Sequence, residues 1–155
     1  MQYVLSFLIS MVPVVELRGG VPFAVGMGIP FFHALPLCAI GNLLPVPFVY
    51  FFARKFLVWG AGKPHIGKAC SFFLVKGERA GQKLVAKTGR GGLFLALLLF
   101  VGIPLPGTGA WTGTLAASFL DMGFKSTVAA VTLGVLLAGC IMALASAGVI
   151  GVIGM

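Results

Sequence analysis

The sequence predicts an all-α integral membrane protein built as an inverted repeat of a re-entrant hairpin followed by a transmembrane helix. Three observations lead to this fold class: the composition, the lengths of the apolar runs and a similarity between the two halves of the chain. The 155 residues are 59% hydrophobic and only 9% charged, and the mean hydropathy is +1.11. Such a composition leaves no room for a soluble domain of any size, so a multi-pass membrane protein is expected.

The apolar runs fall into two length classes. Runs at 31–59 and 124–154 are long enough to cross a bilayer, which needs about 20 residues. Shorter runs pair around clusters of Pro and Gly, and we expect each pair to enter the membrane and return, as a re-entrant hairpin over 3–28 and another over 92–120. Proline lacks a backbone donor, so the hairpin breaks are expected at Pro13, Pro22, Pro104 and Pro106.

An internal repeat follows from a shift of 93 positions. This shift aligns Pro13 with Pro106 and Gly20 with Gly113, at the two breaks. We therefore divide the chain into membrane repeat 1 (1–60), a linker (61–90) and membrane repeat 2 (91–155). A unit that crosses the membrane once places the next unit in the opposite orientation, which makes the repeat inverted, as is common in transporters.

Basic residues set the expected orientation, because they mark the cytoplasmic side. Nearly all of the 11 lysines and arginines lie in or beside the linker. The linker is therefore predicted to be cytoplasmic, with both termini outside. A rival topology has four full spans, a parallel repeat and both termini inside.

The linker itself is predicted to form an amphipathic surface helix. Its basic side chains recur at steps of three and four residues: Lys76, Arg79, Lys83, Lys87 and Arg90. The stripe can rest on anionic lipid headgroups, or it can serve only to fix the topology. Binding of nucleic acid is not expected, since no soluble fold presents the patch.

Other sequence signals indicate structure rather than chemistry. The N-terminus lacks the basic region of a cleaved signal peptide, so we expect it to be retained. Cys38, Cys70 and Cys140 show no metal-binding spacing and are expected to pack. No metal site, cofactor or enzymatic activity is predicted. A stripe of small residues suits close helix packing within the chain or across a homodimer: Gly139, Ala143, Ala147 and Gly151.

The first break carries two charges in apolar surroundings, Glu16 and Arg18, followed by Gly19 and Gly20. Each charge costs roughly 2.5–3.5 kcal/mol at the membrane centre, which makes the pair a candidate site. If the segment is unwound, both side chains can face one cavity. Glu16 can then hold a proton or a cation, and Arg18 can clamp a phosphate or carboxylate. The structural alternative is an ion pair that only ties the hairpin together.

The second break is expected to supply the other half of the site. It has small residues, hydroxyls and an indole but no charge, and the candidate residues are Gly107, Thr108, Gly109, Trp111 and Thr112. Two helix N-termini pointing into the cavity would add positive charge beside Arg18. The sequence therefore predicts a transporter of a phosphate-bearing or otherwise anionic amphiphile, bound at the membrane midplane, with membrane lipids as surroundings and a proton or sodium ion as the coupling ion.

The segment Glu16-Leu17-Arg18-Gly19-Gly20-Val21-Pro22, together with Pro104 to Gly113, resembles the small multidrug export family of prokaryotic membrane proteins. More distantly it is similar to the DedA group. The first resemblance implies drug efflux across the prokaryotic inner membrane, and the second implies translocation of lipid phosphates such as undecaprenyl phosphate. Two alternatives therefore stand beside the anionic amphiphile: export of a lipophilic cation through Glu16 and Trp111, and a non-transporting membrane scaffold.

Overall fold

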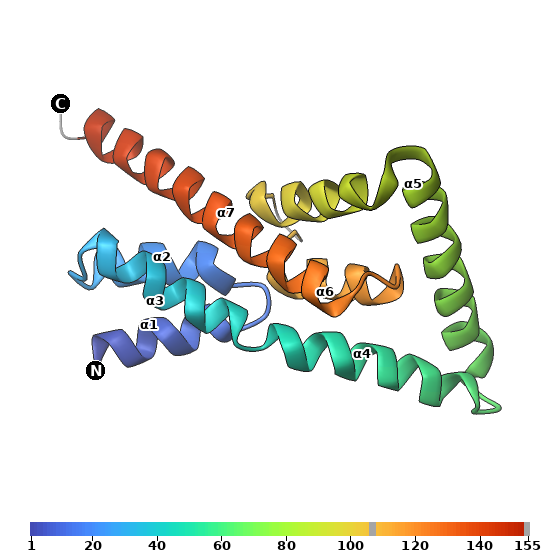
Figure 1. Cartoon of the computed structure of the whole chain (residues 1–155). Helices are drawn as coiled ribbons and strands as arrows, with labels where there is room; N and C mark the ends of the chain where they lie inside the picture. Colours follow the sequence, from blue (N-terminus) through green and yellow to red (C-terminus); the bar gives the residue numbers. More distant parts are fainter. Residues whose placement is uncertain (106–107, 154–155) are drawn as a thin grey trace.

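The computed structural model describes residues 1–105 and 108–153, and every element in these ranges is a helix. Their order along the chain is shown in Figure 1. The bounds are α1 (Gln2–Met11), α2 (Glu16–Gly26), α3 (Phe31–Leu43), α4 (Val46–Ala61), α5 (Gly67–Gly102), α6 (Ala110–Phe119) and α7 (Phe124–Ile153).

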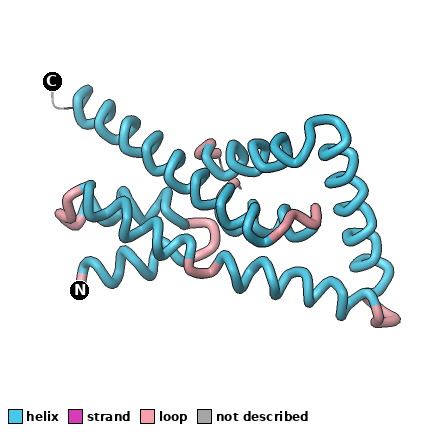
Figure 2. Tube along the Cα trace, viewed as in Figure 1, coloured by secondary structure: helices cyan, strands magenta, loops and turns pink. Residues whose placement is uncertain are grey.

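The helices form two groups joined by α7. Helices α1, α2 and α3 pack on one another, while α6 packs against α4 and α5. The long helix α7 runs across both groups and contacts α2, α3, α5 and α6. Helix α5 turns sharply at Gly89, where φ is 73° and ψ is 177°, so its two arms lie along different directions in Figures 1 and 2. Gly89 has no side chain, so it adopts this φ without strain.

Three helical segments are long and apolar enough to cross a membrane by length and composition: Phe31–Ala61, Val85–Gly102 and Phe124–Ala145. The all-α membrane fold class is therefore confirmed. For Val85–Gly102 the sequence predicted only a short arm, because the apolar run begins at residue 92. The segment begins earlier, at Val85, and includes the turn at Gly89. The re-entrant character and inverted orientation of the repeats stay predictions.

The structure differs from the predicted helices in two places. Helix α2 runs through Pro22, so the predicted break there is wrong. Pro22 has no backbone N–H to donate to the carbonyl of Arg18, four residues earlier in the chain. The helix tolerates Pro22 because only this one hydrogen bond is lost. Conversely, the predicted helix 31–59 is divided into α3 and α4 at Leu44 and Pro45. Pro45 and Pro47 remove two donors in close succession and shift the start of α4 to Val46.

Glycines bring the helices into close contact in both halves. A Cβ atom built on Gly20 would lie 2.9 Å from Cβ of Ser10 on α1, and one on Gly41 would lie 2.7 Å from the carbonyl oxygen of Phe7. The residues related to them by the 93-residue shift make equivalent contacts with α5: Gly113 with Val101, and Gly134 with Val101 and Leu98. Van der Waals packing of this kind drives helix association in lipid, where neighbouring chains are as apolar as the helices.

Polar contacts tie α4 to the turn between α6 and α7. The Tyr50 hydroxyl donates to the carbonyl of Met122, and the Ser118 hydroxyl donates to the carbonyl of Tyr50 at 3.1 Å. Arg54 also pairs with Asp121. Because these two side chains are 37% and 53% exposed, the ion pair is expected to contribute only about 0–1 kcal/mol. The buried Tyr50 and Ser118 contacts therefore hold this end of α6 more firmly.

Alanine should destabilise the protein at one glycine of α7 but not at another. At Gly134 a Cβ atom would lie 2.7 Å from Cβ of Val101 and 2.8 Å from the carbonyl oxygen of Leu98, so Gly134→Ala should lower the free energy of unfolding by about 1–3 kcal/mol through overpacking. At Gly148 nothing lies within 4 Å, so Gly148→Ala should be neutral or stabilising by about 0.5–1 kcal/mol. Unfolding by SDS, followed by circular dichroism, measures both; equal stabilities would contradict the packing account.

Candidate functional site

The break between α1 and α2 adopts an unusual backbone. Val14 has φ 82° and Glu16 has φ 49°, a left-handed region that is a real outlier for a β-branched residue such as valine. Such conformations cost on the order of 1–3 kcal/mol each and persist only where surrounding contacts impose them. Glu16 and Arg18 make contacts with the second break that can impose this backbone.

Glu16 caps the N-terminus of α6. Its carboxylate accepts hydrogen bonds from the backbone N–H groups of Ala110 and Trp111, both at 3.1 Å. Helix α6 begins at Ala110 and has no side-chain cap of its own from Gly109. The negative charge therefore satisfies two free donors and also interacts favourably with the positive end of the helix dipole. With only 5% of its surface exposed, Glu16 is the buried acid that the sequence singled out.

Arg18 holds the loop that precedes α6. Its guanidinium donates to the carbonyl oxygens of Leu105 and Ile103, the latter at 3.2 Å, and to the Thr108 hydroxyl oxygen at 2.9 Å. These bonds use three of the five N–H groups of an arginine. Within the described ranges no ion pair joins Arg18 to Glu16. Each residue instead contacts the second break separately.

These residues surround a pocket of about 620 Å³. Of the predicted site residues it brings together Glu16, Arg18, Thr108, Trp111 and Thr112, along with the predicted break residues Pro13 and Pro104. Gly109 lies directly against the Glu16 carboxylate.

Other predicted positions lie elsewhere. Gly20 is buried against Ser10 and Cys38, and neither Gly19 nor Pro22 lines the pocket. Pro106 and Gly107 fall outside the described residues.

Two buried polar atoms near the site have no hydrogen-bond partner among the described residues: Oδ1 of Asn42 and Nε1 of Trp111. Asn42 lines a small cavity of about 10 Å³ together with Glu16, Arg18 and Gly109. An unpaired buried polar atom costs about 1–3 kcal/mol. The sequence offered no sign of Asn42, since an isolated amide in an apolar run has no distinctive spacing.

An apolar groove of about 520 Å³ adjoins the pocket, and Trp111 and Leu115 line both. Its other walls come from α4, from α5 and the turn before it, and from Phe119 of α6. Sequence reasoning missed this groove, because its side chains are ordinary apolar residues that only the packing of three helices brings together.

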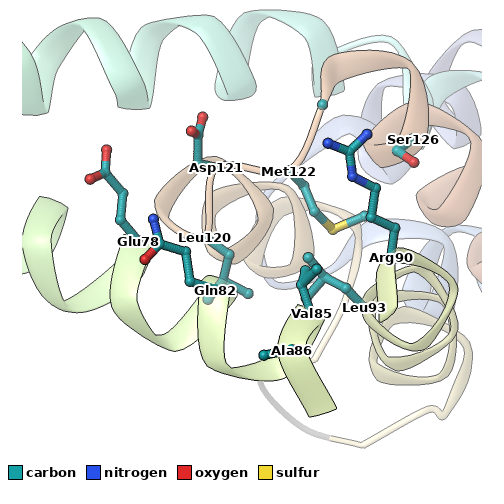
Figure 3. Close-up of a pocket in the computed structure, with 11 residues that line it drawn as sticks. Glu78, Gln82, Val85, Ala86, Arg90, Leu93, Leu120, Asp121, Met122 and Ser126 are labelled. Atoms are coloured by element: carbon teal, nitrogen blue, oxygen red, sulfur yellow. The ribbon is translucent and has the colours of Figure 1, made fainter. Parts of the chain in front are cut away.

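A fourth cavity, of about 730 Å³, lies between α5 and the turn that joins α6 to α7. Figure 3 shows the carboxylates of Glu78 and Asp121 at one end and Arg90 near Ser126 at the other. Its charges are of both signs, and Asp121 is already paired with Arg54. It therefore offers no single preference for an anion or a cation.

The electrostatic prediction needs one correction. Free helix N–H groups were expected to face the cavity, but those of Ala110 and Trp111 are already bonded to Glu16. An anionic ligand can use this helix end only if the Glu16 carboxylate moves away or loses its charge. Arg18 is then the positive group that remains beside it.

The sequence was compared with known families, curated proteins and solved structures. Residues 16–141 match the family model described as "Putative small multi-drug export protein". The chain belongs to this family. The match begins at Glu16, so it includes Glu16, Arg18 and the whole second break, and it indicates an export-type membrane protein rather than an enzyme. No curated protein and no solved structure gave a significant match.

The capping contact predicts a specific effect of a methyl group at position 109. A Cβ atom there would lie 2.6 Å from Cδ of Glu16, so Gly109→Ala should displace the carboxylate and cost about 0.5–2 kcal/mol, the usual value of a lost helix cap. The backbone at Gly109 is extended, with φ 171°, and therefore accepts alanine without strain.

Hydrogen exchange at the amides of Ala110 and Trp111, together with SDS unfolding, measures this effect. Both amides should exchange faster in Gly109→Ala. Gly26→Ala is the matched control, because nothing lies within 4 Å of a Cβ atom there. Unchanged protection in Gly109→Ala would show that Glu16 does not cap α6.

Proposed function

We propose that the protein transports an anionic amphiphile, with a phosphate-bearing headgroup, through the pocket between the two breaks. The observation that supports this most strongly is the position of Glu16. Its carboxylate occupies a helix N-terminus beside an arginine, which is an arrangement suited to binding an anion. Glu16 thus acts as a built-in anion that a substrate headgroup replaces.

The proposed exchange has three steps. The Glu16 carboxylate leaves the N–H groups of Ala110 and Trp111. The phosphate oxygens then accept hydrogen bonds from these groups and from N–H groups of Arg18 that the loop does not use. When the headgroup leaves, Glu16 returns and caps the helix again, so α6 has an anionic partner in both states.

Proton coupling follows from the same exchange. A protonated Glu16 loses its attraction to the helix N-terminus and no longer repels an incoming phosphate. It also gains an O–H donor, and the buried Oδ1 of Asn42 lines the same small cavity as Glu16 without a described partner. Protonation is therefore proposed as the event that frees the site; a sodium ion at Glu16 is the alternative coupling ion.

Export of a lipophilic cation is the second candidate, and the family description favours it. Glu16 and Trp111 could bind a quaternary ammonium through charge and cation–π contacts. Against this, Arg18 lines the same pocket and would repel the cation. In the scaffold alternative, the buried Glu16 and the partly buried Arg18 have no role beyond holding the two breaks together.

The setting of this transport is also a proposal. We place the protein in the inner membrane of a prokaryotic cell, with the basic linker on the cytoplasmic side and both termini outside. Membrane lipids surround it, and a homodimer would complete the pathway, since a chain of 155 residues encloses little space alone.

Binding of headgroups tests the proposal directly. The melting temperature of the purified protein is measured with an alkyl phosphate and with an alkyl trimethylammonium of the same chain length. The phosphate should stabilise the wild type, by about 2.7 kcal/mol at a hundredfold excess over Kd, and this stabilisation should be lost in Arg18→Gln.

The matched control is Arg90→Gln, which removes the same charge from a different cavity and should keep the response. Stabilisation by the ammonium alone, lost in Glu16→Gln but kept in Arg18→Gln, would establish the cation exporter instead. No response to either compound, with normal function in both site variants, would favour the scaffold.

A further inference from the structure

We infer that the hydrocarbon tail of the transported amphiphile lies in the apolar groove between α4, α5 and α6 while its headgroup occupies the pocket at Arg18. This inference rests on the proposed function and names a second part of the binding site. The substrate class is then a phosphate carrying a long single or branched hydrocarbon chain, rather than a small water-soluble anion.

Continuity between the two spaces is the first argument. Trp111 and Leu115, one turn apart on α6, line both the polar pocket and the apolar groove. A ligand whose head contacts Arg18 can therefore extend along α6 past these side chains. Beyond them the groove presents only apolar and aromatic walls, which include Phe52, Phe56 and Phe73.

The groove should hold the tail of a bound substrate in preference to the tails of the surrounding lipids. In a bilayer an apolar groove gains little by burying hydrocarbon, because the lipid tails are equally apolar. A chain that is attached to a bound headgroup, however, has a high effective concentration at the groove. The headgroup thus selects the ligand, and the groove fixes the direction of its tail.

The junction between head and tail has a donor available. Nε1 of Trp111 is buried and has no hydrogen-bond partner among the described residues, and Trp111 borders both spaces. An indole N–H can only donate. The ester oxygen that links a phosphate to its hydrocarbon chain is an acceptor that belongs at this position in the ligand.

Quenching of tryptophan fluorescence tests this placement. The chain has two tryptophans, so Trp59→Phe leaves Trp111 as the reporter. The full-length protein is reconstituted in phosphatidylcholine vesicles that contain a small fraction of an alkyl phosphate brominated at mid-chain. Quenching should exceed that produced by the same fraction of phosphatidylcholine brominated at mid-chain, and the excess should disappear in Ala69→Phe, which fills the groove.

Two further variants make the outcomes distinct. Ala96 is an exposed residue of α5, the helix that also carries Ala69, and it lines none of the four cavities. Ala96→Phe should therefore keep the excess quenching, whereas Arg18→Gln should lose it. Excess quenching that depends on Arg18 but persists in Ala69→Phe would overturn the tail placement and leave the proposed function intact. No excess in the reporter protein itself would contradict both.

Discussion

The contact between the Glu16 carboxylate and the first N–H groups of α6 is the interaction on which the rest of the site depends. A carboxylate that is 5% exposed in an apolar protein must be compensated, because an unpaired buried charge is costly. A helix N-terminus that begins in the interior likewise needs an acceptor. The first break therefore supplies the acceptor, Glu16, and the second break supplies the N–H donors that compensate its charge. Arg18 adds the hydrogen bonds that fix the loop before α6.

This arrangement holds α6 at both ends by contacts of different kinds. Its N-terminus is bonded to a residue that can change charge, whereas the Ser118 hydroxyl near its C-terminal end is bonded to α4 through Tyr50. Loss of the Glu16 contact would free one end while the other stays anchored. Helix α6 also carries Trp111 and Leu115, which line both the polar pocket and the groove. A change at Glu16 would thus act on both parts of the proposed binding site.

The sequence predicted the membrane class and the charged site because both follow from solvation: few charges occur in lipid, and those that do need a reason. It did not predict that Glu16 would cap α6, since a hydrogen bond between residues 94 positions apart has no local pattern. Pro22 was misread as a break because a proline after the first turn usually ends a helix. The groove and Asn42 were missed because apolar walls and a single amide become a site only through tertiary packing.

The most direct test of the account is whether Glu16 and the substrate headgroup compete for the same helix end. Isothermal titration of an alkyl phosphate into wild type, Glu16→Ala and the charge-matched control Glu78→Ala measures this. Binding to Glu16→Ala alone should be tighter, by about 1 kcal/mol, because the helix N-terminus is then free for the phosphate. Equal or weaker binding to Glu16→Ala would contradict the competition and, with it, the role of Glu16 as a replaceable anion.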